Sequence, residues 1–220
     1  MTHTAEGERL FERDVLKIRA GSVSLMDTFE ATVEDYERRF TDCPRDELTS
    51  EVDARVDGDL IVDALVELGL IDPRTIAELC ALADQLDPST NDGWLQLLPV
   101  LRLFRSENIR DDGAPEQAIP VPADHLPFLT EIHSPTLTYI WLDDCPPCDS
   151  LKRSLESIFE EPQGVSLFAV FGPDDSAFLA REYRVTGGPA LLFMRQGAVE
   201  TRLYGDHEEQ LVRAELERLT

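Results

Sequence analysis

The pattern of hydrophobic and polar positions differs between the two halves of the chain. From about residue 8 to 107, apolar residues recur at steps of three and four, as one face of a helix requires. Segments 58–70 and 76–86 show this period. The first half is therefore predicted to be helical. Its first series consists of Leu25, Phe29, Val33, Tyr36 and Phe40.

Segment 93–104 (GWLQLLPVLRLF) is apolar on nearly all sides. A helix of this kind is buried or covered by a partner, and Pro99 is expected to end or kink it. The segment raises the hypothesis of a homodimer formed through the helical half. No catalytic motif is found in this half, so the sequence leaves its role open.

Beyond residue 117 the pattern changes to short apolar runs separated by helical stretches. The order of these elements is β-α-β-α-β-α-β-β-α, and Gln196-Gly197 has a spacing suited to a tight hairpin. This order predicts a mixed sheet with helices on both faces. The expected strands lie at 118–121, 136–142, 165–171, 190–195 and 199–204, and the expected helices at 123–132, beyond the cysteine at 145, at 174–183 and from 207.

These patterns divide the 220 residues into three parts. We expect an α-helical N-terminal domain over 1–110 and an α/β domain over 118–220. Between them, segment 111–117 is polar and contains Gly and Pro, which is typical of a linker.

The composition is strongly acidic, with 44 Asp and Glu against 20 Lys and Arg and a net charge of −24. Only Lys17 and Lys152 are lysines. This style is typical of proteins from extreme halophiles, and a specific basic partner is the alternative explanation. Such a surface repels nucleic acid and anionic membranes, so neither is expected as a partner.

No run reaches the roughly 18 apolar residues of a membrane span, and the N-terminus lacks the regions of a signal peptide. We therefore expect a cytoplasmic protein. Four cysteines are too few for a disulfide scaffold. A close pair of them is therefore expected to be catalytic or metal-binding.

Cys145 and Cys148 form such a pair, in the stretch YIWLDDCPPCDSLKRSL. Pro146 and Pro147 are tolerated only in the first turn of a helix, where the backbone N–H groups have no intrahelical acceptor. The helix is thus predicted to begin at the pair, with both sulfurs on one side and close enough for a disulfide. The helix dipole favours the thiolate of Cys145, which makes it the attacking sulfur, and Cys148 the resolving one.

From Cys145 to Gly205 the chain resembles the thioredoxin family, onto which it can be laid without a gap. Trp141 takes the place of the family's strand tryptophan, and Pro189 that of its cis-proline. Gly197 and Gly205 match glycines of the terminal hairpin and its exit. The resemblance implies a thioredoxin-like fold over roughly 115–220.

The resemblance also implies a thiol-disulfide oxidoreductase that reduces protein disulfides and is recycled by a reductase. Cys145 and Cys148 would be the catalytic residues, and no cofactor or metal would be needed. The implied substrate groove consists of Trp141, Pro146, Pro147, Gly188 and Pro189.

The chain departs from the family at four positions. Asp144 replaces the exposed tryptophan before the first cysteine, and Tyr139 replaces a buried acid that helps to deprotonate the resolving thiol. Val170 replaces the lysine beside that acid, and Gly188 a bulky aliphatic residue. We expect slower release of reduced substrate and a wider groove.

Other readings of the cysteines stay open. A zinc site usually needs four ligands, and Cys43 and Cys80 have no companion cysteine at metal spacing. The two cysteines could also be buried structural thiols, but this interpretation leaves the two prolines between them unexplained. A thioredoxin-fold interaction module or redox sensor is the main rival, and the lost acid and lysine favour it.

Overall fold

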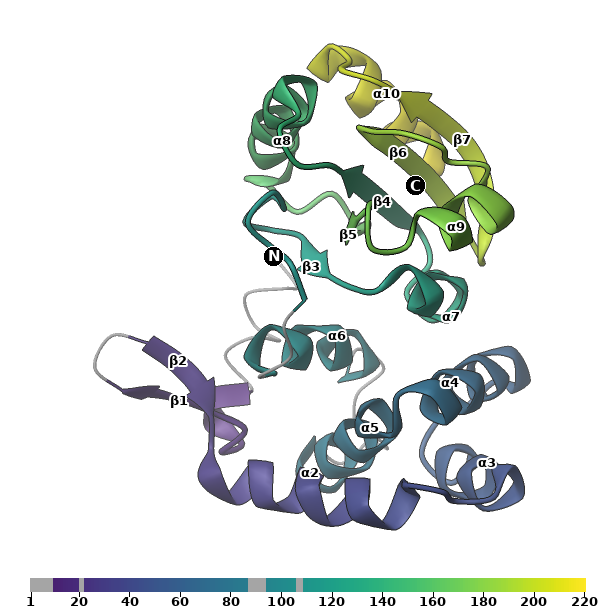
Figure 1. Cartoon of the computed structure of the whole chain (residues 1–220). Helices are drawn as coiled ribbons and strands as arrows, with labels where there is room; N and C mark the ends of the chain where they lie inside the picture. Colours follow the sequence, from purple (N-terminus) through teal and green to yellow (C-terminus); the bar gives the residue numbers. More distant parts are fainter. Residues whose placement is uncertain (1–9, 20–21, 87–93, 106–108) are drawn as a thin grey trace. The chain divides into compact units, whose positions relative to one another are not determined.

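The computed structural model describes residues 10–19, 22–86, 94–105 and 109–220, which Figure 1 colours along the sequence. The chain forms two compact units, residues 1–105 and 106–220. Whether they correspond to separately folding domains with the expected bounds stays a prediction. None of the described helices is long and apolar enough to cross a membrane.

The first unit is a helical assembly, as the periodicity predicts. Helix α5 lies at its centre, because every residue from Thr75 to Ala83 is buried. Its neighbours α2 and α4 each bury one side, including Phe29 and Val33 of α2. The helices are α2 (Asp27–Phe40), α3 (Arg45–Asp53), α4 (Asp59–Ile71) and α5 (Pro73–Leu86).

A short hairpin precedes these helices and corrects the prediction. Strands β1 (Leu16–Arg19) and β2 (Ser22–Leu25) pair antiparallel, with Leu16 opposite Leu25. Leu25 thus ends a strand, whereas the periodicity placed it on a helix that in fact begins at Asp27. The β-branched residues Ile18 and Val23, which lie opposite each other, favour the extended backbone.

The apolar segment is not one helix but three short turns, η2 (Trp94–Leu97), α6 (Leu98–Leu101) and η3 (Arg102–Phe104). Its first expected residue, Gly93, lies outside the described residues. Pro99 lies in the first turn of α6, where its missing N–H costs nothing. Leu98 and Leu101 are buried, but Leu103 is 52% exposed, so the segment is not covered on all sides.

The second unit is built on a five-stranded sheet in the order β3-β5-β4-β6-β7. The first three strands in this order run parallel, and β6 and β7 are antiparallel to their neighbours. This mixed sheet confirms the expected thioredoxin-like fold class. The strands are β3 (Ile119–Pro120), β4 (Thr136–Trp141), β5 (Ser166–Phe171), β6 (Ala190–Arg195) and β7 (Ala198–Tyr204).

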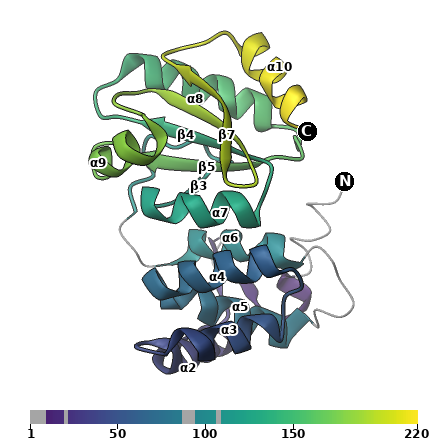
Figure 2. The same cartoon turned by 90° about the vertical axis from the view of Figure 1, so that its right-hand side faces the viewer.

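Helices cover both faces of this sheet. Figure 1 and Figure 2 both show α8 and α10 on one face, with α7 and α9 on the other. Because side chains alternate along a strand, Tyr139 and Trp141 of β4 join the core beneath α8 and α10. The helices are α7 (Leu126–Ile132), α8 (Pro146–Phe159), α9 (Ser176–Phe178), which continues as the π-turn η5 (Leu179–Tyr183), and α10 (Glu209–Leu219).

Candidate redox site

The cysteine pair lies at the start of α8, as the two prolines predict. Cys145 is the N-cap, with a non-helical backbone, and Pro146 and Pro147 form the first turn. The N–H of Cys148 donates to the carbonyl of Cys145 at 2.8 Å and to its sulfur at 3.2 Å. The cap of this helix is therefore a cysteine sulfur that accepts from the N–H of Cys148, at the helix end where the dipole favours negative charge.

Cys145 and Cys148 form a disulfide, with their Cα atoms 5.2 Å apart. The two sulfurs differ in access, since Cys148 is only 3% exposed while Cys145 is half-buried. Pro146 and Pro147 are exposed beside Cys145. A second molecule would therefore reach Cys145 first.

Strand β4 leads into the pair through a tight turn. It ends at Trp141, and Asp144, immediately before Cys145, adopts a left-handed backbone with φ 48°. Aspartate tolerates this region better than most residues do. Trp141 itself is 3% exposed, so it forms part of the core rather than an open surface.

A hollow of about 280 Å³ adjoins the disulfide. Its wall brings together Trp141 and both cysteines, as the resemblance implied, but Gly188 and Pro189 are not among the described residues that line it. Four of its residues are aspartates. The lining residues are Asp112, Gly113, Trp141, Leu142, Asp143, Asp144, Cys145, Cys148 and Asp149.

Residues 110–113 are part of this site, although the sequence suggested only the end of the helical domain and the start of a linker. Both guanidinium Nη atoms of Arg110 donate to the Asp143 carboxylate at 2.8 Å. The same guanidinium lies 4.1 Å from the ring centre of Phe171 and 5.3 Å from that of Trp141. The hydrogen bonds from Arg110 lower the pKa of Asp143.

Tyr139 lies beneath the start of α8, where the family has an acid. It is fully buried, and its hydroxyl donates to the carbonyl of Cys148 at 3.0 Å. Burial raises the pKa of Tyr139, so the phenol stays neutral. Val170 pairs with Ile140 in the neighbouring strand and is also buried. Neither side chain supplies the charge of the residue that it replaces.

Gly188 precedes Pro189 in a cis peptide bond, as the resemblance implied. A Cβ at Gly188 would lie 3.0 Å from Cγ of Leu142 and 3.3 Å from the carbonyl of Ile140. Leu142 therefore packs closely over the glycine. Whether Gly188 widens the substrate groove stays a prediction.

The other two cysteines belong to the first unit and are not disulfide-bonded. Cys80 is fully buried, and burial raises its thiol pKa to about 12. Cys43 is half-buried, and burial likewise raises its pKa. Across the described part of the chain, no group of three or more His, Cys, Asp or Glu side chains is placed to hold a metal ion.

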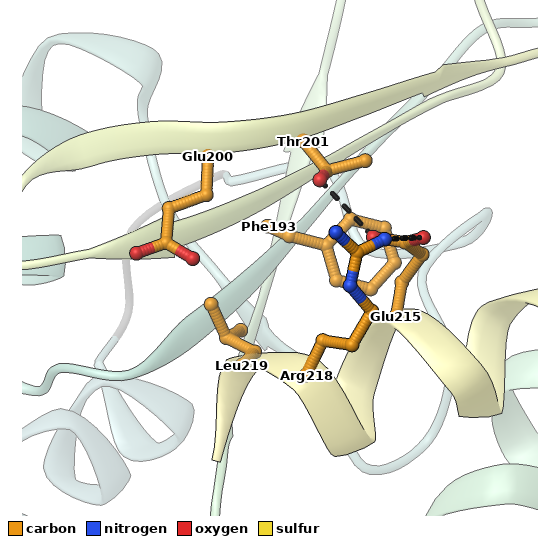
Figure 3. A pocket seen from close by; sticks show the side chains of 6 residues that line it. All are labelled: Phe193, Glu200, Thr201, Glu215, Arg218 and Leu219. Atoms are coloured by element: carbon orange, nitrogen blue, oxygen red, sulfur yellow. Dashed lines mark hydrogen bonds and ion pairs between the residues drawn. The ribbon is translucent and has the colours of Figure 1, made fainter.

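Another hollow, of about 230 Å³, lies between β7 and α10 (Figure 3). Its charged groups bond to neighbours, since Glu215 accepts from Thr201 at 3.1 Å and from Arg218 at 2.9 Å. Glu200 accepts from Arg195 at 3.0 Å. This hollow contains no cysteine, so the disulfide hollow is the candidate site.

Part of the chain is similar to known thioredoxins. No model of a protein family matches the chain. The chain is 33% identical to bovine mitochondrial thioredoxin over 75 residues, which are 34% of this chain and 45% of that protein. The match thus spans less than half of the relative's length.

The solved structures that resemble the chain include several thioredoxins. A mutant thioredoxin from Halobacterium salinarum is 23% identical, with a TM-score of 0.42, over 49% of this chain and 95% of its own. The thioredoxin of Trypanosoma brucei brucei is 20% identical, with a TM-score of 0.43, over 50% of this chain and 96% of its own.

Proposed function

We propose that the chain is a thiol-disulfide oxidoreductase that reduces protein disulfides through Cys145 and Cys148. The observation that carries this proposal is the bonded pair at the start of α8, with one sulfur accessible and the other buried. A helix N-terminus stabilises the thiolate that such a reaction needs.

The reaction begins with both cysteines reduced. The Cys145 thiolate attacks one sulfur of the substrate disulfide, forming a mixed disulfide and releasing the first substrate thiolate. Cys148 then loses its proton and attacks the Cys145 sulfur, which releases the second substrate thiolate. The substrate gains two electrons and two protons, and the chain ends with the Cys145–Cys148 disulfide. An external dithiol reductant restores the reduced pair.

The surface around Cys145 would receive an extended segment of the substrate protein. Pro146 and Pro147 are exposed beside the sulfur. Gly188 and Pro189 would form the second wall of the proposed groove, as the resemblance implies. Trp141 supports this surface from within the core. No cofactor or metal enters the reaction.

Homodimer formation through the helical part stays a prediction, with the exposed Leu103 as the residue to test.

Trapping of mixed disulfides tests the mechanism. Replacing Cys148 by Ser removes the resolving thiol, so mixed disulfides between Cys145 and substrate proteins should accumulate. Dithiothreitol should reduce these adducts and release the substrate. The same chain with Cys145→Ser is the matched control and should trap nothing. If Cys148→Ser yields no adducts with any disulfide protein, the proposed mechanism is wrong.

The rival function is a protein-interaction module whose cysteines sense redox state. Tyr139 and Val170 favour it, since neither can assist proton transfer from Cys148. In this case a double Cys145→Ser, Cys148→Ser variant would retain its partner in a pull-down. The wild type would then show no turnover with insulin, a substrate whose disulfides are easily reduced.

A further inference from the structure

The segment from Arg110 to Gly113, here called the strap, lies directly against the disulfide site. Arg110 holds both oxygens of Asp143 at 2.8 Å, and one of its Nη atoms also donates to Asp112 at 2.9 Å. Lys152 of α8 donates to the carbonyl of Asp112 at 3.2 Å. Gly113 approaches the Trp141 indole so closely that a Cβ would lie 2.2 Å from it. The strap is therefore attached to β4, α8 and the turn between them.

The contacts of Arg110 differ from those of an ordinary surface ion pair. An isolated exposed pair has little effect, because water and salt screen it. Here a planar guanidinium makes two parallel hydrogen bonds to one carboxylate and also lies over the rings of Phe171 and Trp141. These contacts fix the position of Asp143, which is two residues before Cys145.

The charged side chains around the two sulfurs indicate how Arg110 affects the site. Negative charges near a thiol disfavour its thiolate, and an adjacent cation offsets them. Arg110 is a cation held beside two of the four aspartates in the wall. The charged groups that line the hollow beside the disulfide are Asp112, Asp143, Asp144 and Asp149. Two cations bind to this wall, Arg110 through Asp112 and Asp143 and Lys152 through the carbonyl of Asp112.

We propose that Arg110 is a positioning residue of the redox site, which holds Asp143 and the turn before Cys145 in place and offsets the negative charge next to the attacking sulfur. The proposal rests on the proposed function and names a residue that tunes it. Arg110 belongs to a segment outside the part that resembles the thioredoxin family. Its effect on the attacking cysteine would therefore be particular to chains that contain the strap.

The experiment measures the rate at which iodoacetamide alkylates Cys145 in the reduced full chain from pH 5 to 9, with each cysteine peptide followed by mass spectrometry. Arg110→Gln should slow the reaction at neutral pH and 0.05 M KCl by about two- to five-fold and move the midpoint of the pH–rate profile upward. The double variant Arg110→Gln, Asp143→Asn should recover most of the rate. In 1 M KCl, which shortens the screening length to about 3 Å, the difference should shrink.

Arg153→Gln is the matched control, because Arg153 is an exposed arginine of α8 that donates to the backbone of Asp149 at 3.2 Å. It removes the same charge without touching the strap and should change the rate less. The proposal is overturned if Arg110→Gln reacts as fast as the wild type, if it merely matches Arg153→Gln, or if Asp143→Asn does not restore the rate. If the wild type fails to reduce insulin but these rate changes appear, the proposed function is wrong, while the effect of Arg110 on the reactivity of Cys145 is confirmed.

Discussion

Tyr139 is the residue at which this site differs most from the arrangement that the resemblance implied. A buried carboxylate can accept a proton from the resolving thiol, whereas a phenol whose pKa is raised by burial cannot do so at neutral pH. Its hydroxyl instead donates to the carbonyl of Cys148. Tyr139 therefore stabilises the start of α8 rather than taking part in proton transfer.

Replacing Tyr139 by Phe tests this structural role. The variant leaves the Cys148 carbonyl without this donor, and the free energy of unfolding should fall by about 1 kcal/mol. Urea unfolding of the full chain measures the difference. Tyr36→Phe is the control, because the Tyr36 hydroxyl bonds to the exposed Asp84 at 2.7 Å and should contribute less. Equal stability of Tyr139→Phe and the wild type would contradict the assigned role.

The residues of the redox pair could be predicted, whereas those of the strap could not. Two prolines between two cysteines restrict where a helix can begin, and this local rule placed Cys145 at the cap. Gly113 gave a different signal, because glycine and proline mark a loop without indicating what the loop packs against. The contact of Gly113 with Trp141 joins residues far apart in the sequence, which no local pattern encodes.

At the scale of elements, the fold was predicted well where apolar residues recur with the period of a strand or a helix over a long enough segment. The second unit has three largely buried strands, β4, β5 and β6, together with amphipathic helices, and its element order is the one expected. The hairpin β1–β2 was missed because two four-residue strands are too short to show a period of two against a helical background. Segment 94–104 was expected to be a helix ended or kinked at Pro99, and it forms three short turns instead, because apolar composition alone does not distinguish a helix from successive short turns.

A buried ionic network ties α5 to the end of the apolar segment in the first unit. Asp72 accepts from Arg102 at 2.8 Å and from Arg105 at 2.7 Å, and its side chain is 10% exposed. Burial opposes ionisation of Asp72, but the two arginines outweigh it and lower its pKa to about 2. The network also includes the fully buried Glu78, which pairs with Arg105 at 2.7 Å.

This network should make the stability of the chain depend on pH. The folded pKa of Asp72 lies below its unfolded value of about 3.9, so its contribution is complete above pH 4 and is lost as the pH falls towards 2. We expect Asp72→Asn to lower the free energy of unfolding by about 3 kcal/mol at pH 6. Between pH 4 and 2 the wild type should lose about 2 kcal/mol that the variant does not lose.

Urea unfolding at several pH values, with the exposed Asp57→Asn as control, measures this effect. The gap between Asp72→Asn and the wild type should narrow on acidification, while Asp57→Asn stays close to the wild type throughout. A gap of constant size from pH 6 to 2 would show that the charge of Asp72 does not contribute.

At the scale of the whole molecule, there are more acidic side chains than the basic side chains can pair with. Even if each basic side chain paired with one acid, the net charge of −24 would remain as unpaired carboxylates. The described ion pairs show that arginines are already in use, several with two or three acids each, as Arg74 is with Glu30, Glu37 and Glu78. Mutual repulsion of the remaining carboxylates destabilises the compact state.

Salt should therefore stabilise this chain. Raising KCl from 0.05 to 1 M shortens the screening length to about 3 Å, and the melting temperature should rise by about 2–4 °C for each 1 kcal/mol of repulsion removed. Thermal unfolding followed by circular dichroism measures the rise. A variant with Asp57→Lys and Asp174→Lys, both at exposed positions, carries less negative charge and should gain less from the same salt. If the melting temperature stays constant or falls across this range, the acidic surface is not an adaptation to salt, and a basic partner becomes the better explanation for it.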